Sequence, residues 1–138
     1  MGRNGNSSGS GVSVRGEEMK IFISGKITGV KDYMARFEAA EKFLEAMGYE
    51  GNVINPAKVC DSLPKETTEY EEYIDVTLTL LKQCDAVFML DGWEESRGAS
   101  LEWQYATTFG YEIFYEKKIL EEFYTKSMLE CVELILGD

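Results

Sequence analysis

The chain has 138 residues, of which 44% are hydrophobic and 12% aromatic, and its formal net charge is −11. This length fits one domain with one core, and no apolar run approaches the ~20 residues that span a bilayer, which argues against a membrane protein. The charge argues against a nucleic-acid polymer as partner, because phosphate contacts need clustered Lys and Arg. A small anion held by backbone N–H groups stays possible.

The first 18 residues are mostly Gly, Ser and Asn, with almost nothing to bury and no apolar centre of a signal peptide. They are predicted to be a disordered leader or a cloning remnant, followed by a single α/β domain over residues 19–138. Cys60, Cys84 and Cys131 stand at unrelated spacings, which favours reduced thiols in a cytoplasmic protein. No metal-ligand spacing occurs, and neither a metal nor a cofactor is expected.

Two elements are predicted at the start of the domain. Residues 20–24 form a short apolar run before a glycine-containing loop, which is typical of a strand. Residues 32–47 have the pattern of an amphipathic helix, and Gly48 stands where a helix commonly ends. The apolar positions of this helix are Phe37, Ala40, Leu44 and Met47.

The middle of the domain predicts a strand, a loop, a helix and a strand. Residues 53–56 predict a strand that ends at Pro56, because proline cannot continue a central ladder. Residues 57–69 are polar and aperiodic, which predicts a loop. Residues 70–83 predict a second helix, and residues 85–90 form a near-continuous apolar run, as in a strand covered on both faces. The apolar face of the second helix is Ile74, Leu78 and Leu81.

Two more helices and a strand complete the prediction. A helix begins near Gly98 or Ala99 and ends at Gly110, residues 112–116 predict a strand, and residues 117–136 predict a long helix. The inner side of the first of these helices is expected at Leu101, Tyr105 and Thr108. The terminal helix can pack on its own sheet or form an interface through Leu129, Val132, Leu134, Ile135 and Leu136.

Strands that alternate with helices predict a three-layer, Rossmann-like (flavodoxin-like) α/β fold, in which helices flank a parallel sheet. In such sheets ligands bind outside the carboxyl ends of the strands. Three loops are predicted to lie there: residues 24–29, 55–69 and 91–98. A site is therefore expected where these loops meet.

The first loop offers a cradle for a small polar ligand. Gly25 and Gly29 can bring backbone N–H groups close to a phosphate or sugar, with Ser24, Lys26 and Thr28 in support. A tight structural turn explains the two glycines equally well. The loop matches neither the dinucleotide fingerprint nor the P-loop.

Carboxylates are the leading candidates for catalysis, because the chain contains no histidine. Glu102 falls in the first turn of its predicted helix, where an acidic residue is favoured with or without a catalytic role. Ser96 can cap that helix or contact a ligand, and Trp93 can belong to the core or stack on a substrate. Asp75 can lie on a solvated helix face or point toward the strand ends and orient a substrate.

Three stretches together resemble a known superfamily: SGKITG at residues 24–29, GYEGNVINP at 48–56, and residues 70–116. The likeness is to nucleoside 2-deoxyribosyltransferases and 2'-deoxynucleoside 5'-monophosphate N-glycosidases, in a branch of small proteins. It covers about residues 20–116 and is strongest over residues 84–110.

The resemblance implies a glutamate nucleophile that attacks the anomeric carbon of deoxyribose and releases the base. The matching pattern here is Ser96, Gly98 and Glu102. Water would complete a hydrolysis and a second base a transfer. Ser96 stands where the nucleoside transferases have Asp, as in the monophosphate hydrolases, which suits a 5'-phosphate because a carboxylate would repel it.

The resemblance also implies contacts and partners that the motifs alone do not specify. The substrate is a deoxynucleoside or its 5'-monophosphate, Tyr33 or Trp93 would flank the base, and a homodimer or larger homo-oligomer is expected. One position departs from the pattern, because Thr77 stands where an acid usually helps the base to leave. Asp75 lies about 200° around the helix from that position. The alternative is therefore a nucleotide-binding or nucleotide-sensing protein with weak or no catalysis.

Overall fold

The computed structural model describes residues 19–136, so the predicted leader lies outside the described residues. One parallel sheet has the strand order β2-β1-β3-β4. Its strands are β1 (Ile21–Ser24), β2 (Val53–Ile54), β3 (Ala86–Met89) and β4 (Glu112–Tyr115). The helices are α1 (Tyr33–Leu44), α2 (Pro56–Asp61), α3 (Tyr70–Leu81), α4 (Arg97–Thr108) and α5 (Glu116–Leu136). A π-helical turn (Glu45–Tyr49) follows α1, and a 3₁₀ turn (Trp93–Glu95) precedes α4.

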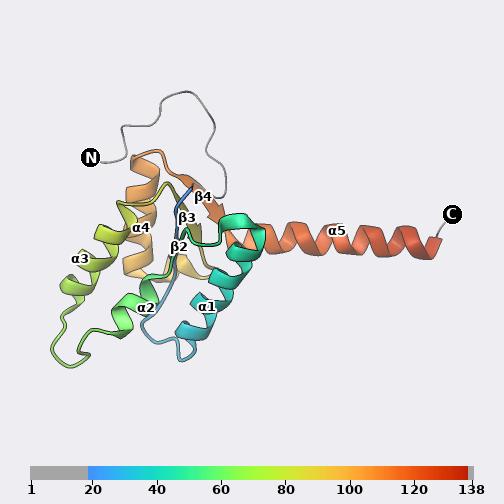
Figure 1. Ribbon diagram of the computed structural model, residues 1–138. Coiled ribbons are helices and arrows are strands. Elements are labelled where there is room, and N and C mark those ends of the chain that lie inside the picture. The colour runs from blue at the N-terminus through green and yellow to red at the C-terminus, as the bar shows by residue number, and fades with distance from the viewer. Residues whose placement is uncertain (1–18, 137–138) are drawn as a thin grey trace.

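The sheet is covered on both faces, as the predicted three-layer α/β fold requires (Figure 1). Every residue of β1 and β3 is buried, because successive side chains point to opposite faces and both faces are covered. Ile23 and Phe88 pack with α1 on one face. Phe22 and Val87 pack with α3 and α4 on the other.

The predicted loop at residues 57–69 contains part of a helix, so that prediction is wrong for its first turns. Helix α2 begins at Pro56, and the side chain of Asn55 caps it by accepting a hydrogen bond from the Ala57 N–H at 3.0 Å. Asparagine before proline is a common helix start, since proline at the first helical position lacks an N–H that would be unpaired there anyway. The dipeptide was interpreted only as the end of a strand.

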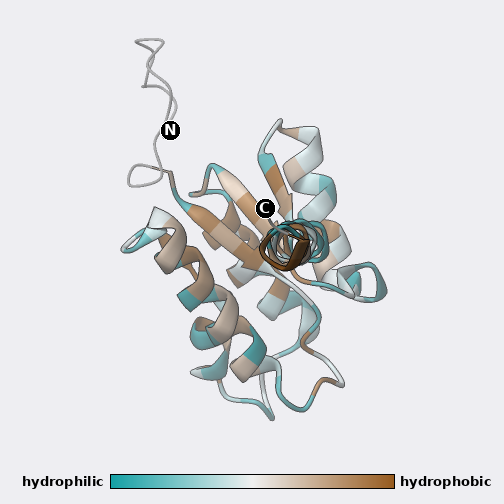
Figure 2. Cartoon of the chain, turned by 90° about the vertical axis from the view of Figure 1, so that its right-hand side faces the viewer, coloured by the Kyte–Doolittle hydropathy of each residue, from teal (hydrophilic) through white to brown (hydrophobic). Residues whose placement is uncertain are grey.

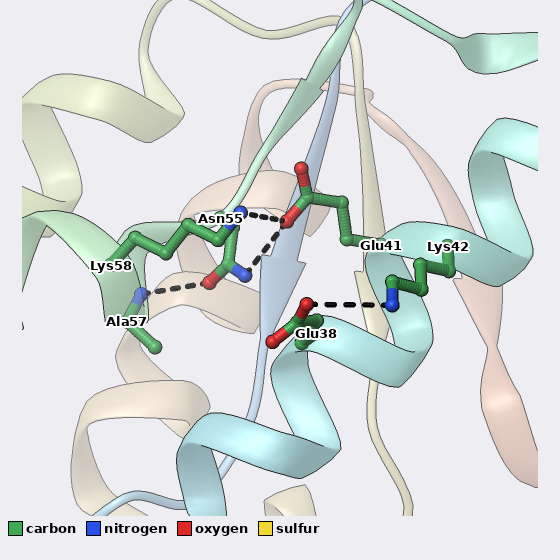
Figure 3. A network of polar contacts seen from close by, with 6 residues as sticks. All are labelled: Glu38, Glu41, Lys42, Asn55, Ala57 and Lys58. Carbon is green, nitrogen blue, oxygen red and sulfur yellow. Dashed lines mark hydrogen bonds and ion pairs between the residues drawn. The ribbon is translucent and has the colours of Figure 1, made fainter.

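A polar network ties α2 to α1 (Figure 3). The Asn55 amide donates to Glu41 Oε1 at 3.0 Å, and Lys58 Nζ lies 3.0 Å from the same oxygen. Burial would raise the pKa of Glu41, but the hydrogen bonds from Asn55 and Lys58 outweigh it, and the net shift is downward. The network therefore holds the start of α2 against α1.

The buried faces of two helices differ from those predicted. In α1, Phe37, Ala40 and Leu44 are buried as expected, whereas Met47 in the following turn is 52% exposed. In α4 the predicted inner residues Leu101 and Thr108 are exposed. The buried residues of α4 are Ala99, Glu102 and Ala106. The pattern of apolar residues did not identify the buried face of α4, because Glu102 on that face is a charged residue type.

The terminal helix α5 projects away from the rest of the domain (Figure 1). Its first turns contact the α1 side, where Ile119 packs on the core and the Phe123 ring lies 5.9 Å from that of Phe43. Every residue from 120 to 136 is exposed. Packing along its own sheet, one of the two alternatives for this helix, is therefore wrong. Within residues 19–136, no helix has the length and hydrophobicity to cross a membrane.

Candidate active site

A cavity of about 650 Å³ lies at the carboxyl end of the sheet beside β1 and β3. The chain runs from β1 to β2 on one side and from β3 to β4 on the other, so the connections diverge between β1 and β3. Parallel sheets of this kind bind ligands at such a point. All three predicted loops contribute to its wall, together with α3. The lining residues are Gly25, Lys26, Ile27, Thr28, Tyr33, Cys60, Lys65, Tyr70, Tyr73, Ile74, Thr77, Glu95, Ser96, Arg97, Gly98, Ala99 and Glu102. The volume suits a ligand of nucleotide size.

Glu102 is the buried carboxylate of this cavity, with 6% of its surface exposed. Ser24, the last residue of β1, donates a hydrogen bond from its hydroxyl to Glu102 Oε1 at 2.5 Å. The Thr77 side chain also hydrogen-bonds with this carboxylate, and its hydroxyl lies 3.2 Å from the Ile74 carbonyl oxygen. Three elements far apart in sequence therefore converge on one acidic group.

The environment of Glu102 changes its proton affinity. Burial raises the pKa of Glu102 and the hydrogen bonds from Ser24 and Thr77 lower it; burial is the larger effect, so the pKa rises from 4.5 to about 7. The Ser24 hydroxyl donates to the carboxylate, which limits the cost of removing its charge from water. The group can therefore exchange a proton near neutral pH, a property common among catalytic carboxylates.

The glycine loop after β1 fits closely against β3. A Cβ atom at Gly25 would lie 2.7 Å from Leu90 Cδ1, so this position has no room for a side chain. The loop then lines the cavity with Lys26, Ile27 and Thr28. Both earlier interpretations of the loop are compatible with this geometry, since a tight structural approach and a cavity wall occur in the same segment.

The N-terminus of α4 forms another part of the wall. Ser96 caps this helix, because its Oγ accepts from the Ala99 N–H at 3.1 Å, and it also lines the cavity. A Cβ atom at Gly98 would lie 3.2 Å from Ile74 Cδ1 and 3.8 Å from the Tyr70 hydroxyl oxygen. Glycine thus allows α3 and α4 to approach each other. The Tyr70 hydroxyl is buried and has no hydrogen-bond partner among the described residues.

Three cationic side chains line the cavity of this acidic protein. Lys26 Nζ lies 3.9 Å from Glu95 Oε1, and Lys65 Nζ lies 3.1 Å from Asp61 Oδ1. The Arg97 guanidinium carbon stands 4.7 Å from the centroid of the Tyr70 ring. These cations, with the positive end of α4, favour an anionic group in the ligand.

Several lining residues were missed by sequence reasoning. Tyr70, Tyr73 and Ile74 belong to the first two turns of α3, and the helical pattern did not indicate that this end faces a cavity. Cys60 was counted only as a reduced thiol, although it lines the cavity from α2. Burial, followed by the charge of Glu102, raises the pKa of the Cys60 thiol.

Three predicted site residues lie elsewhere. Asp75 is exposed on α3 and does not line the cavity, because Thr77, two residues further on, occupies the inward side of that helix. Trp93 is half-buried and packs against the core cluster on the α3–α4 face of the sheet, stacked on Trp103 with ring centroids 5.3 Å apart. Gly29 is exposed beyond the lining part of its loop. The other predicted residues line the cavity, apart from Ser24, which reaches it through Glu102.

No group of three or more His, Cys, Asp or Glu side chains suited to a metal ion occurs between residues 19 and 136. The polar groups at the cavity include hydroxyls and cations that can donate hydrogen bonds, and the buried carboxylate of Glu102. This set can hold a sugar phosphate and present a carboxylate to it.

Comparison with known proteins gives one match. The model of a family described as a domain of unknown function, DUF4406, matches residues 19–115. No curated protein and no solved structure matches the chain. The family match extends from the start of the described domain to the last residue of β4, so it includes the sheet and every residue that lines the cavity. The chain therefore belongs to the DUF4406 family.

Proposed function

We propose that the protein is an N-glycosidase or deoxyribosyltransferase that cleaves the base–sugar bond of a 2'-deoxynucleoside 5'-monophosphate. The observation that carries the proposal is Glu102, a buried carboxylate held by Ser24 and Thr77 in a cavity of nucleotide size. An acidic side chain is costly to bury, and a chemical role at a ligand site explains its presence. The resemblance of the Ser96, Gly98 and Glu102 pattern to nucleotide N-glycosidases supports the same reaction.

The reaction would proceed through a glycosyl-enzyme ester. An oxygen of ionised Glu102 forms a bond to C1' as the C1'–N bond breaks, and the base leaves with the bonding electron pair. Water then adds to C1', the ester bond breaks, Glu102 is released as a carboxylate, and the proton that water loses passes to the departed base. A second base in place of water gives transfer. Because the attacking form is ionised, activity should rise with pH around the Glu102 pKa of about 7.

The 5'-phosphate would lie toward the N-terminus of α4. Arg97, Lys26 and Lys65 supply positive charge there, and the buried Tyr70 hydroxyl offers a donor without a protein partner in the described structure. Ser96 keeps a hydroxyl proton that it can donate, because its oxygen serves as acceptor in the helix cap. A phosphate would thus accept hydrogen bonds from the Tyr70 and Ser96 hydroxyls. A nucleoside lacks this group, so we expect the monophosphate to be preferred.

Among the described residues, the lining of the cavity offers no second buried carboxylate beside Thr77 that could protonate the leaving base. Glu95 is the other acidic residue of the lining, and its side chain is 79% exposed and paired with Lys26. Tyr33 and Tyr73 line the cavity and can hydrogen-bond to a departing base. The reaction is therefore expected to be slow, and fastest for bases that leave readily without full protonation.

A second candidate is a nucleotide-binding protein without turnover. Thr77 favours it, because a hydroxyl stands in the place of the expected acid and hydrogen-bonds to the nucleophile. In that case Glu102 would bind a sugar hydroxyl rather than attack C1'. Both candidates require the same pocket, so they differ in release of base and not in binding.

The decisive experiment compares two carboxylate-to-amide variants. Each of the four deoxynucleoside monophosphates and the free nucleosides is incubated with the protein, and free base is followed by chromatography. Glu102→Gln should lower base release by at least about a thousandfold, as expected for loss of a nucleophile. Asp75→Asn changes an exposed carboxylate outside the cavity and should leave the rate unchanged.

Other outcomes discriminate between the candidates. Nucleotide binding in calorimetry without release of any base supports the second candidate. Equal loss in both variants contradicts the assignment of Glu102, and absence of both binding and release contradicts both candidates. An added excess of a different base separates transfer from hydrolysis through the appearance of a new nucleotide.

A further inference from the structure

A charged pair from two helices far apart in sequence holds the backbone of Asp91. The Asp91 N–H donates to Glu116 Oε1 at 2.8 Å, and the Asp91 carbonyl oxygen accepts from Arg36 Nη2 at 3.0 Å. The two side chains also face each other, with Arg36 Nη2 3.8 Å from Glu116 Oε1. Arg36 belongs to α1 and Glu116 begins α5, so two elements fix both polar backbone groups of one residue. We call Arg36, Asp91 and Glu116 the Asp91 clamp.

The Asp91 clamp lies at the carboxyl edge of the sheet, which is also the edge of the cavity. Asp91 follows β3, and Glu116 follows β4. Figure 2 looks along α5, which starts directly at the end of β4. Leu90, the residue before Asp91, donates its N–H to the Ser24 carbonyl oxygen at 2.8 Å. Ser24 is the residue whose hydroxyl binds Glu102, so the clamp is one residue away from the support of the buried carboxylate.

A series of hydrogen bonds leads from the clamp to the start of α4. Gly92 turns the chain with a φ of 88°, a conformation that favours glycine. In the 3₁₀ turn that follows, the N–H groups of Trp93, Glu95 and Ser96 each donate to the carbonyl oxygen three residues earlier. The Ser96 hydroxyl oxygen then accepts from the Ala99 N–H. A displacement at the clamp would therefore reach the first turn of α4.

The segment between the clamp and α4 is mostly exposed, so its backbone contacts matter for its position. Asp91, Glu94 and Glu95 are exposed, whereas Trp93 is half-buried and stacks on Trp103. This stack holds the middle of the segment, and the clamp holds its start. The guanidinium and carboxylate side chains of the clamp are 30% and 24% exposed, so water screens them less than it screens a fully exposed pair.

We propose that Glu116 and Arg36 are positioning residues that set the place of the α4 N-terminus, and with it the anion-binding end of the cavity. Neither side chain lines the cavity, so both act through the backbone and not by contact with a ligand. Ser96 and Arg97, at the start of α4, do line it. The effect on a nucleotide rests on the proposed function, in which the 5'-phosphate lies at this end. Binding of a monophosphate should therefore depend on the clamp more than binding of a nucleoside.

Hydrogen exchange followed by NMR tests the clamp without any substrate. Glu116→Ala removes the acceptor from Asp91, and Arg36→Met removes the donor to its carbonyl oxygen. Either change should speed exchange of the backbone N–H groups of residues 93–99 at least about tenfold, because a hydrogen bond to a charged group is lost. Glu116→Gln keeps an oxygen acceptor and should restore most of the protection. Glu121→Ala removes an exposed carboxylate from the same helix and should leave exchange unchanged.

Ligand dependence tests the consequence for the cavity. Glu116→Ala should raise KM for a deoxynucleoside monophosphate about tenfold and leave KM for the free deoxynucleoside unchanged, because only the monophosphate uses the α4 N-terminus. It should change kcat by less than about threefold, since Glu102 keeps its hydrogen bond from Ser24. A merely structural role would weaken both ligands alike. If the wild type binds nucleotides without releasing base, dissociation constants from calorimetry replace KM in the same comparison.

The outcomes separate this inference from the proposed function. A wild type that neither binds nor cleaves nucleotides would contradict the function, while the exchange data would still decide whether the clamp positions α4. Unchanged exchange in a folded Glu116→Ala or Arg36→Met variant would overturn the inference, as would equal weakening of nucleotide and nucleoside. Loss of folding in both variants, seen by circular dichroism, would also overturn it, since the pair would then stabilise the whole domain and not one segment.

Discussion

Helices α4 and α5 depart from the usual distribution of polar and apolar residues in opposite ways. Helix α4 buries a carboxylate, with Glu102 only 6% exposed, whereas α5 leaves Leu134 84% exposed. Each arrangement is unfavourable for the isolated chain, because a buried charge loses hydration and an exposed leucine orders water around it. The proposed nucleotide ligand would explain the buried carboxylate of α4.

A buried carboxylate or an exposed apolar helix says more about ligands and partners than residues that follow the usual burial rule. The buried leucines and phenylalanines of the sheet explain the fold but identify no ligand or partner. Glu102 is informative because two hydroxyls were placed to hold it. The apolar residues of α5 are informative because they are large and every residue from 120 to 136 is exposed.

The largest expected effect concerns the energetic cost of burying Glu102. Since the pKa of Glu102 rises from 4.5 to about 7 on folding, the folded state retains a proton that the unfolded chain loses between these values. Stability should therefore fall as pH rises from about 4 to 7, and Glu102→Gln should be more stable than wild type by about 3 kcal/mol at pH 8. Denaturant titrations at pH 4.5 and pH 8 measure this. An equal difference at both pH values would contradict a raised pKa.

A smaller effect is expected at the partner of that carboxylate. Ser24 donates at 2.5 Å to Glu102 and lowers its pKa, so Ser24→Ala should raise this pKa further. Loss of a buried hydrogen bond to a charged group should cost about 2 kcal/mol at pH 8 and less at pH 5, where the carboxyl is neutral. The same denaturant titrations, run on this variant, give both numbers. A uniform loss at every pH would mean that Ser24 acts only through packing.

The smallest effect is expected in α5. Because Leu129 is exposed, Leu129→Glu should change the free energy of unfolding by less than about 0.5 kcal/mol. Denaturant titration at submicromolar concentration measures this change. A loss above 1 kcal/mol would show that this part of α5 packs on the domain, which would remove the contrast with α4.

Much of the site could be predicted from the sequence because a parallel α/β fold specifies where loops converge. Ser24, Lys26, Thr28, Ser96, Gly98 and Glu102 all come to the cavity or to its carboxylate, as expected of segments that follow buried strands. Asp75 does not, and Thr77 does. Position along a helix indicates which residues share a face, but the rotation of α3 about its axis depends on packing against α4, where Gly98 permits close approach.

Composition and pattern by themselves determined the α/β class, the order of the elements apart from α2, and the residues of the central strands, because each follows from local periodicity. Tertiary structure decided which side of α4 is buried, that Trp93 belongs to the core and that Cys60 and Tyr70 line the cavity. It also decided that α5 leaves the sheet. These outcomes depend on contacts between segments distant in sequence, whose packing energies outweigh the local preference of any single helix.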